Sequence, residues 1–417
     1  MRQAFPRVEQ VEMRQLPPLT VVTPLPPSPS GIADYAAEQL PSLAKHFAPH
    51  VLVQEPVQLE QTRVEGVKLS AFDAAEFSMS NIDHPILYHI GNNAFHEFVF
   101  RAALEKPGYV VLHDFVLHHL IVELTLARND PKGYRDYLIH DHGEKGRSLA
   151  EQRENYAFTS LQEFLLPLNG KILDAAKGVI VHSHWAKRQV KDLRPRLPVA
   201  RVPHHFYADD IPHLSSSREE ARRKLGIAQD VIVFLCIGHI TPPKQVELVA
   251  KALGRMRHQL PPFMFLLVGE ASDPASLQSV LKHAGISDCT RLTGRVHMST
   301  FQEAIIAADV VCNLRYPTAG ESSGTMMRAL GFGRCCVVFD YASFSDFSSD
   351  VCVKVPLNTF DAAPLAETLL DLARSPERRN TLGDAARRWA RNECSVAKCV
   401  RAGAEFIMSQ EAELAAK

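Results

Sequence analysis

The sequence lacks the features of a membrane, secreted or nucleic-acid-binding protein. No apolar run approaches the ~18 residues that a transmembrane helix needs, and residues 1–9 carry no apolar core of the signal-peptide kind. The formal net charge of the 417 residues is −1, so no overall field draws the chain to nucleic acid. The sequence also contains no long basic amphipathic helix of the kind that binds a membrane surface, so membrane association is possible but has no support in the sequence. A cytoplasmic location is therefore expected, with no nucleic-acid partner.

Cysteine is present but is not arranged for metal binding or for a disulfide framework. All eight cysteines lie in the second half, without a C-x-x-C pair, and several lie in apolar runs where a thiol acts as a small core residue. The phosphate-binding fingerprints G-x-x-x-x-G-K-[ST] and G-x-G-x-x-G are also missing, and no D-x-D pair follows a predicted strand. We therefore expect neither a metal ion nor a cofactor.

Length and pattern predict two α/β domains. The chain is too long for one ordinary core, and apolar strand-like runs alternate with helical patterns, as in parallel sheets. The pattern restarts near residue 230, after a Pro- and Ser-rich zone at 194–217 that is the predicted hinge. Two doubly wound sheets facing each other would form a ligand cleft at their carboxyl edges. The predicted strands are 19–23, 50–54, 85–89, 108–113 and 178–182, then 231–237, 263–268, 290–293, 309–314 and 335–339.

Residues 309–333 have the composition of an anion-binding strand–loop–helix unit. A buried strand leads into a loop that holds one acidic residue, Glu321, and Ser322 or Ser323 can cap the following helix. Backbone N–H groups at such a helix start can bind phosphate, and Gly324 allows close approach. A phosphate site beside a carboxylate that can accept hydrogen bonds from hydroxyls suggests a nucleotide sugar. An ordinary βα connection, with Glu321 favouring only the helix dipole, remains the alternative.

Lys244 lies at the start of a predicted helix, where a cation is unfavourable unless an anion lies there too. A diphosphate would resolve this conflict, whereas the alternative is a surface lysine lying along apolar neighbours.

In the first half, a stiff Pro-rich loop after the first strand leads to Gly31. This glycine either lets a ligand approach the backbone or is needed only for its backbone freedom in a turn. His113 ends a buried strand and is predicted to face the cleft.

Together these segments resemble the family 4 retaining glycosyltransferases of GT-B fold, the bacterial group 1 class. The resemblance covers nearly the whole chain and depends on an ordered set of motifs. They are Ser-Gly-Ile-Ala-Asp-Tyr at 30–35, Leu-His-Asp at 112–114, Gly-His-Ile-Thr-Pro-Pro-Lys at 238–244, Val-Gly-Glu at 268–270, Thr-Gly-Arg-Val at 293–296 and Ala-Ala-Asp-Val at 307–310.

The resemblance implies two Rossmann-like domains facing across a cleft. Residues 1–208 would bind the acceptor, residues 209–392 would bind the nucleotide-sugar donor, and a C-terminal helix at about 393–417 would cross back to the first domain. The implied activity is transfer of a sugar from a nucleoside diphosphate to an acceptor hydroxyl with retention and without a metal, in polysaccharide or glycoconjugate biosynthesis. Because no carboxylate is a clear nucleophile, front-face attack by the acceptor fits better than double displacement.

Site residues follow from the matching motif positions. By resemblance, His113 and Glu321 contact the donor sugar and Lys244 contacts the diphosphate, and these three form the catalytic set. The other expected donor-binding residues are Gly31, Gly238, His239, Gly269, Arg295, Val296, Ser322, Ser323, Gly324, Thr325 and Arg328. The expected acceptor-binding residues are Asp34, Tyr35, Asn92, Asn93, His96 and Asp114, although the two asparagines and His96 could instead be turn formers.

Two positions depart from the family pattern. His239 follows the glycine after which the family usually has a basic residue, and Arg328 replaces the second Glu, which normally holds the ribose. Because arginine cannot accept hydrogen bonds, Arg328 is expected to face a phosphate or a solvated surface. A non-catalytic nucleotide-sugar sensor, which Arg328 favours, and a nucleotide-sugar epimerase are the rival functions. The acceptor and the oligomeric state stay open.

Overall fold

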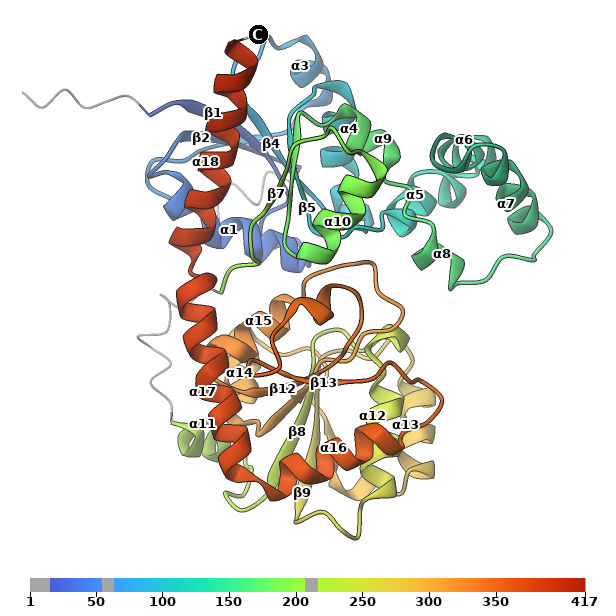
Figure 1. The fold of residues 1–417 in the computed structure, drawn as a ribbon, viewed down its shortest axis with the longest axis vertical. Coiled ribbons are helices and arrows are strands. Elements are labelled where there is room, and N and C mark those ends of the chain that lie inside the picture. Colours follow the sequence, from blue (N-terminus) through green and yellow to red (C-terminus); the bar gives the residue numbers. More distant parts are fainter. Residues whose placement is uncertain (1–15, 55–63, 207–216, 417) are drawn as a thin grey trace, which may run out of the picture.

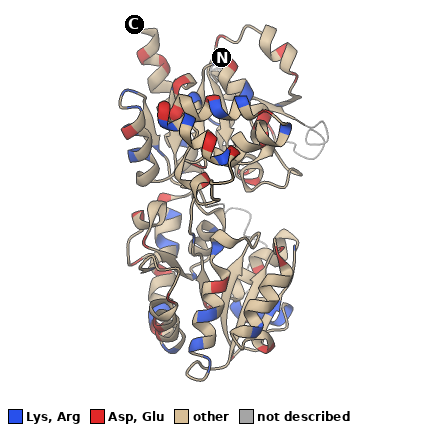
Figure 2. Cartoon of the chain, turned by 90° about the vertical axis from the view of Figure 1, so that its right-hand side faces the viewer, with Lys and Arg blue, Asp and Glu red and all other residues tan. Residues whose placement is uncertain are grey.

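The computed structural model describes residues 16–54, 64–206 and 217–416. The N-terminal residues 1–9 lie outside these ranges, as do residues 207–216 of the predicted hinge and Lys417. The boundary predicted between residues 208 and 209 therefore also falls outside the described residues. Figure 1 shows two domains stacked along the long axis of the molecule, and Figure 2 shows acidic and basic residues interspersed along the chain in both.

Seven parallel strands form the first sheet, in the order β3-β2-β1-β4-β5-β6-β7. The order reverses between β1 and β4, so the carboxyl ends of these strands lie at the topological switch point. Strands β4 and β5 are fully buried because the sheet is covered on both faces. The strands are β1 (Pro18–Val22), β2 (Ala48–Val53), β3 (Lys68–Ala71), β4 (Ile86–Ile90), β5 (Tyr109–Leu112), β6 (Gly178–Val181) and β7 (Val199–Arg201).

The helices of the first domain follow its strands, and α6 to α8 project sideways from it (Figure 1). The projection lies within residues 128–169, a long stretch that is rich in polar residues. The helices are α1 (Gly31–Leu43), α3 (Ala74–Met79), α4 (Glu97–Glu105), α5 (His118–Leu124), α6 (Pro131–His142), α7 (Glu144–Glu154), α8 (Gln162–Leu165), α9 (Gly170–Ala175) and α10 (His184–Leu193).

Six parallel strands form the second sheet, in the order β10-β9-β8-β11-β12-β13, with its reversal between β8 and β11. Separate hydrophobic clusters cover its two faces. The strands are β8 (Ile232–Ile237), β9 (Phe263–Val268), β10 (Thr290–Leu292), β11 (Val310–Cys312), β12 (Cys335–Phe339) and β13 (Val353–Val355). The helices are α11 (Arg218–Lys224), α12 (Val246–Arg255), α13 (Pro274–His283), α14 (Met298–Ala307), α15 (Gly324–Gly331), α16 (Ala363–Arg374) and α17 (Pro376–Glu393).

The last helix, α18 (Val396–Ala415), returns to the first domain (Figure 1). Its residues Cys399, Val400 and Ile407 are buried in the same cluster as Leu19 and Val21 of β1. This crossing confirms the predicted architecture of two doubly wound α/β domains joined by a returning C-terminal helix. Within the described ranges, no helix combines the length and the apolarity needed to cross a membrane.

Candidate functional site

A cavity of about 1060 Å³ lies between the carboxyl edges of the two sheets. Loops after β1, β5, β8, β9 and β11 all reach it, which follows from the two switch points. Most residues expected to form the site line this cavity. They are Gly31, Asp34, Tyr35, Asn93, His113, Asp114, Gly238, His239, Lys244, Gly269, Arg295, Val296, Glu321, Ser322, Ser323, Gly324, Thr325 and Arg328.

Asn92 and His96 are not brought to the cavity, which corrects their expected placement. The Asn92 backbone N–H donates to Asp114 at 2.8 Å, and its side-chain oxygen accepts from the Leu120 N–H at 3.0 Å. His96 is 0% exposed, and its Nδ1 donates to the backbone oxygen of His89 at 3.0 Å. Both residues therefore shape the loop after β4 from inside the domain.

The loop before α15 holds Glu321 in a fixed position. Its Oε2 accepts from the Thr318 hydroxyl at 2.5 Å, and that hydroxyl oxygen accepts from the Gly320 N–H at 3.0 Å. Of the two serines considered as caps, Ser323 caps α15 by accepting from the Met326 N–H at 3.2 Å. The carboxylate is thus oriented beside the start of a helix whose first residues, Gly324 and Thr325, line the cavity.

Two cations lie together at this end of the second sheet. Lys244 Nζ donates to the Ile237 carbonyl at 2.9 Å, and burial, followed by the charge of Arg315, lowers its pKa to about 7. The buried Nε of Arg315 has no hydrogen-bond partner among the described residues, and its Nη1 lies 3.8 Å from Glu321. A side chain at position 238 would meet Lys244 Nζ at 2.7 Å, so Gly238 makes room for this cation. The motif matching missed Arg315, although its position directly after an apolar strand was a usable signal.

On the opposite wall, three histidines form a hydrogen-bonded chain. His182 Nδ1 must donate to the Val202 carbonyl at 2.9 Å, so its Nε2 accepts from His113 Nδ1 at 3.1 Å. His113 Nε2 then accepts from His89 Nδ1 at 3.1 Å. Burial lowers the pKa of all three rings, to about 3 for His89 and about 4 for His182, so the chain is neutral at physiological pH. His113 reaches the cavity, but both of its ring nitrogens are already engaged.

Asp114, next to this chain, is a carboxyl group with an unusual proton affinity. Burial, followed by the nearby charge of Glu321, raises its pKa to about 7, against the hydrogen bond from the Asn92 N–H. At neutral pH it is therefore distributed between an acceptor and a donor form. Such a group is suited to contact a hydroxyl.

Arg328 forms an ion pair across the two domains instead of facing solvent. Its Nη2 donates to Oε1 of Glu38 on α1, and Glu38 Oε2 accepts from His205 Nε2 at 2.8 Å. Burial raises the pKa of Glu38, but its hydrogen bonds and charge contacts with His205 and Arg328 outweigh burial and lower it. Glu38, His204 and His205 all line the cavity and were missed as site residues. The His204–His205 pair lies in the stretch predicted only as a hinge.

Among the described residues, no group of three or more His, Cys, Asp or Glu side chains is arranged to hold a metal ion. All eight cysteines are free thiols, and seven of them are buried. The side chains that line the cavity include the cations Lys244, Arg315 and Arg328, the carboxyl groups of Asp114 and Glu321, and the neutral imidazole of His113.

Comparison with known proteins first identifies the second domain. Residues 217–389 match the family model described as glycosyl transferases group 1. The D-inositol 3-phosphate glycosyltransferase of Geodermatophilus obscurus is 34% identical over 116 residues, which is 26% of this chain and 25% of that protein. The protein of the same name from Kribbella flavida is 26% identical over 176 residues, 40% of this chain and 41% of that one. The chain thus spans less than half the length of the curated relatives it matches.

Solved structures match nearly the whole chain at low identity. Anabaena HepE in complex with UDP has 16% identity and a TM-score of 0.64, covering 94% of this chain and 100% of its own. Sucrose-phosphate synthase from Thermosynechococcus elongatus has 14% identity and a TM-score of 0.68, covering 95% and 100%. At such identities the likeness shows the fold, which is the GT-B arrangement of these proteins.

Proposed function

Because residues 217–389 belong to the group 1 glycosyl transferases and the chain has the GT-B fold, we propose that the protein is a retaining glycosyltransferase. It transfers a sugar from a nucleoside diphosphate to an acceptor hydroxyl without a metal ion. The first domain contributes the acceptor side of the cleft, and the second contributes the donor side.

The observation that carries the proposal is the pair of cations at the start of α15. Lys244 and the unpartnered Nε of Arg315 lie beside a single fixed carboxylate, Glu321. When Lys244 is protonated, the two cations carry more positive charge than the single carboxylate Glu321 offsets, and they lie near a helix start, so a further anion is favourable there. A diphosphate supplies that anion. Its neutralisation by these groups also supports a reaction without a metal.

The same groups suit the chemistry of transfer. As the bond from the anomeric carbon to the phosphate oxygen breaks, Lys244, Arg315 and the α15 N–H groups stabilise the charge that develops on the leaving diphosphate. Glu321 accepts from a hydroxyl of the donor sugar. The acceptor oxygen bonds to the anomeric carbon from the face that the diphosphate leaves, and its proton passes to the departing phosphate oxygen. Asp114 lies where it can orient the acceptor hydroxyl.

Donor assays with the purified chain test the proposal. UDP-, GDP- and ADP-sugars are incubated with it, starting with UDP-glucose because HepE was also solved with that ligand. Acceptors include inositol phosphate, after the name of the curated relatives. We expect one donor to be consumed, and Glu321→Gln to reduce turnover ~10²-fold, as lost transition-state contacts do. Glu367→Gln, the same change at an exposed position on α16, should leave turnover unchanged.

The outcomes also separate the rival functions. A changed sugar on the nucleotide without any acceptor would identify an epimerase. Tight donor binding without turnover on any acceptor would identify a non-catalytic sensor, a function that Arg328 in place of a second carboxylate favours. Failure of every donor to bind or react would reject all three functions considered for the cleft.

A further inference from the structure

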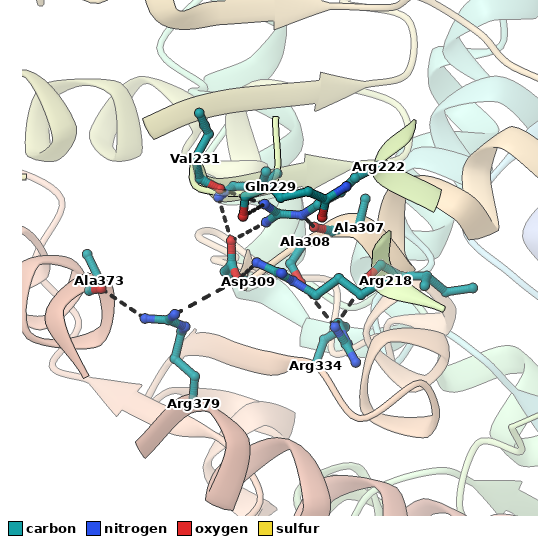
Figure 3. A network of polar contacts seen from close by, with 12 residues as sticks. Arg218, Arg222, Gln229, Val231, Ala307, Ala308, Asp309, Arg334, Ala373 and Arg379 are labelled. Carbon is teal, nitrogen blue, oxygen red and sulfur yellow. Dashed lines mark hydrogen bonds and ion pairs between the residues drawn. The ribbon is translucent and has the colours of Figure 1, made fainter. Parts of the chain in front are cut away.

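A second cluster of charges lies at the opposite edge of the second sheet, at the amino ends of β11 and β12. Figure 3 shows that its centre is Asp309, which directly precedes β11. Asp309 Oδ1 accepts from Arg218 Nη2 at 2.6 Å, and Oδ2 accepts from Arg222 Nη2 at 2.6 Å. The Val233 N–H also donates to Oδ2 at 2.8 Å. Both oxygens of this carboxylate are therefore already engaged.

Two further arginines come to the same place without a carboxylate of their own. Arg379 Nη2 lies 4.0 Å from Asp309 Oδ1, and Arg379 Nη1 donates to the carbonyls of Leu372 and Ala373. Arg334 donates to backbone carbonyls only, with its Nη1 3.1 Å from the Ile306 oxygen. Across the described residues, Asp309 is the one carboxylate that pairs with any of these four arginines.

The positive charge is thus in excess at a partly buried position. Burial lowers the pKa of Arg334 to about 10, and the charges of Arg387 and Arg218 act in the same direction. Carbonyl oxygens satisfy individual N–H groups but do not neutralise the charge of a guanidinium. A cluster held together only for structure would be more stable with a second carboxylate.

A cavity of about 210 Å³ opens between these groups. Arg218 from α11, Arg334 before β12 and Arg379 from α17 line it together with Asn380, and the engaged carboxylate Asp309 also borders it. Guanidinium groups from three separate elements thus converge on one cavity, and guanidinium N–H groups are strong donors to the oxygens of a tetrahedral oxyanion. The first turn of α17 also borders the cavity at Pro376, and its cap, Ser375, makes no side-chain hydrogen bond to the helix.

We propose that this cavity, formed by Arg218, Arg334, Arg379 and Asn380, is a phosphate-binding site separate from the interdomain cleft. It takes inorganic phosphate or the phosphate group of a small phosphorylated metabolite. A bound phosphate bridges α11, the start of β12 and α17. It thereby connects the start of the long helix that leads into α18 to the amino edge of the sheet.

The test uses the full chain in a chloride buffer. The ionic strength is kept constant, because added phosphate would otherwise change the screening of surface charges as well as occupy the site. Inorganic phosphate and glucose 6-phosphate are titrated calorimetrically and followed by melting temperature, and the two arms distinguish free phosphate from a phosphate ester. The Lys244→Ala background removes one of the two cations proposed to bind phosphate in the cleft, so phosphate binding there is weakened while the second site is untouched. We expect saturable binding that persists in this background.

Two matched pairs of variants locate the binding. Arg379→Gln should weaken phosphate binding at least tenfold. Arg378→Gln, the same change at the exposed neighbouring residue, should leave phosphate binding unchanged. Asn380→Asp places a carboxylate at the cavity while keeping every arginine. It should raise the melting temperature without phosphate and abolish the further rise with phosphate. Asn392→Asp, at an exposed position near the other end of α17, should do neither.

Absence of phosphate binding to the Lys244→Ala protein would overturn the proposal. Equal weakening by Arg378→Gln and Arg379→Gln would do the same, because it would show unspecific attraction to surface charge. If Arg379→Gln fails to fold, the Asn380→Asp pair still decides. Phosphate stabilisation that is unchanged in Asn380→Asp would place the anion elsewhere.

Discussion

The two walls of the cleft differ in how they carry charge. The wall from the first domain presents His113 backed by His89 and His182, all kept neutral by burial. The wall from the second domain presents Lys244 and Arg315 beside a fixed carboxylate. We call the part formed by the three histidines the neutral wall and the part formed by Lys244, Arg315 and Glu321 the charged wall. Neutral polar groups suit hydroxyls, and cations suit a diphosphate. The division of labour proposed for the two domains is thus present in their electrostatics.

This difference has a simple structural origin. His89, His113 and His182 lie at the carboxyl ends of the neighbouring strands β4, β5 and β6, so parallel pairing brings them into one row. The charged wall is instead built from loops and the start of α15, where side chains and backbone N–H groups converge from several directions. Changes to the charged wall should therefore have the larger effects on binding and catalysis.

Removing the buried lysine from the charged wall should have the largest effect. Lys244→Ala leaves the leaving diphosphate without one of its two proposed cations, so we expect turnover to fall by ~10²-fold or more. Lys251→Ala, at an exposed position on α12, is the matched control and should retain full turnover. Steady-state kinetics with the donor found in the panel measures both. Full activity of Lys244→Ala would remove the distinction between the walls.

The same lysine should make nucleotide binding depend on pH. Burial lowers its pKa to about 7 in the free protein, and a bound diphosphate would raise that pKa. Above pH 7 binding must then take up a proton, so affinity should fall with rising pH, by at most about tenfold per unit. Calorimetry in buffers of different ionisation enthalpy would detect the proton. A Lys244→Arg protein stays charged throughout, so an equally steep pH profile in that variant would assign the proton to another group.

The Arg328–Glu38 ion pair, which joins the two domains, should contribute less to donor binding than Lys244 does. Arg328 and Glu38 lie on opposite domains and are only 15% and 17% exposed. A double-mutant cycle with Arg328→Gln and Glu38→Gln should therefore give a coupling of roughly 0.5–3 kcal/mol in donor affinity. The doubly substituted protein should bind the donor better than the sum of the single losses predicts. Strict additivity would mean that the pair does not link the domains during binding.

Sequence patterns predicted the parts of this molecule that depend on local apolar runs. Strands such as β8 and β9 were predicted because each is a run of six apolar residues that is mostly buried. Strands β3, β7 and β13 were missed. These three strands have only three or four residues each and include partly exposed positions. All three lie at the edge of a sheet, so each pairs with a neighbouring strand on one side only. Their strand conformation comes from the neighbouring strand.

The candidate site shows the same limit at longer range. Residues at strand ends were predicted because motif and strand boundary coincide. The Glu38 contacts were missed because its partners, His205 and Arg328, are 167 and 290 positions away in the chain. Nothing local distinguishes Glu38 from an ordinary exposed residue of an amphipathic helix. The fold creates its role by placing α1 opposite α15.

The smallest effect is expected from His113, although the family resemblance places it in the catalytic set. Its Nδ1 and Nε2 are already bonded to His182 and His89, so it meets the cleft with ring carbons and shapes the wall. His113→Asn should therefore lower kcat/KM by less than about tenfold and lower the melting temperature as the histidine chain breaks. His182→Asn, which removes the acceptor for His113 Nδ1, should produce a similar loss of stability without touching the cavity between the sheets. A ~10²-fold loss of kcat in His113→Asn at unchanged melting temperature would mean that a ring nitrogen leaves the chain to contact the donor sugar. The neutral wall would then take part in the chemistry as directly as the charged one.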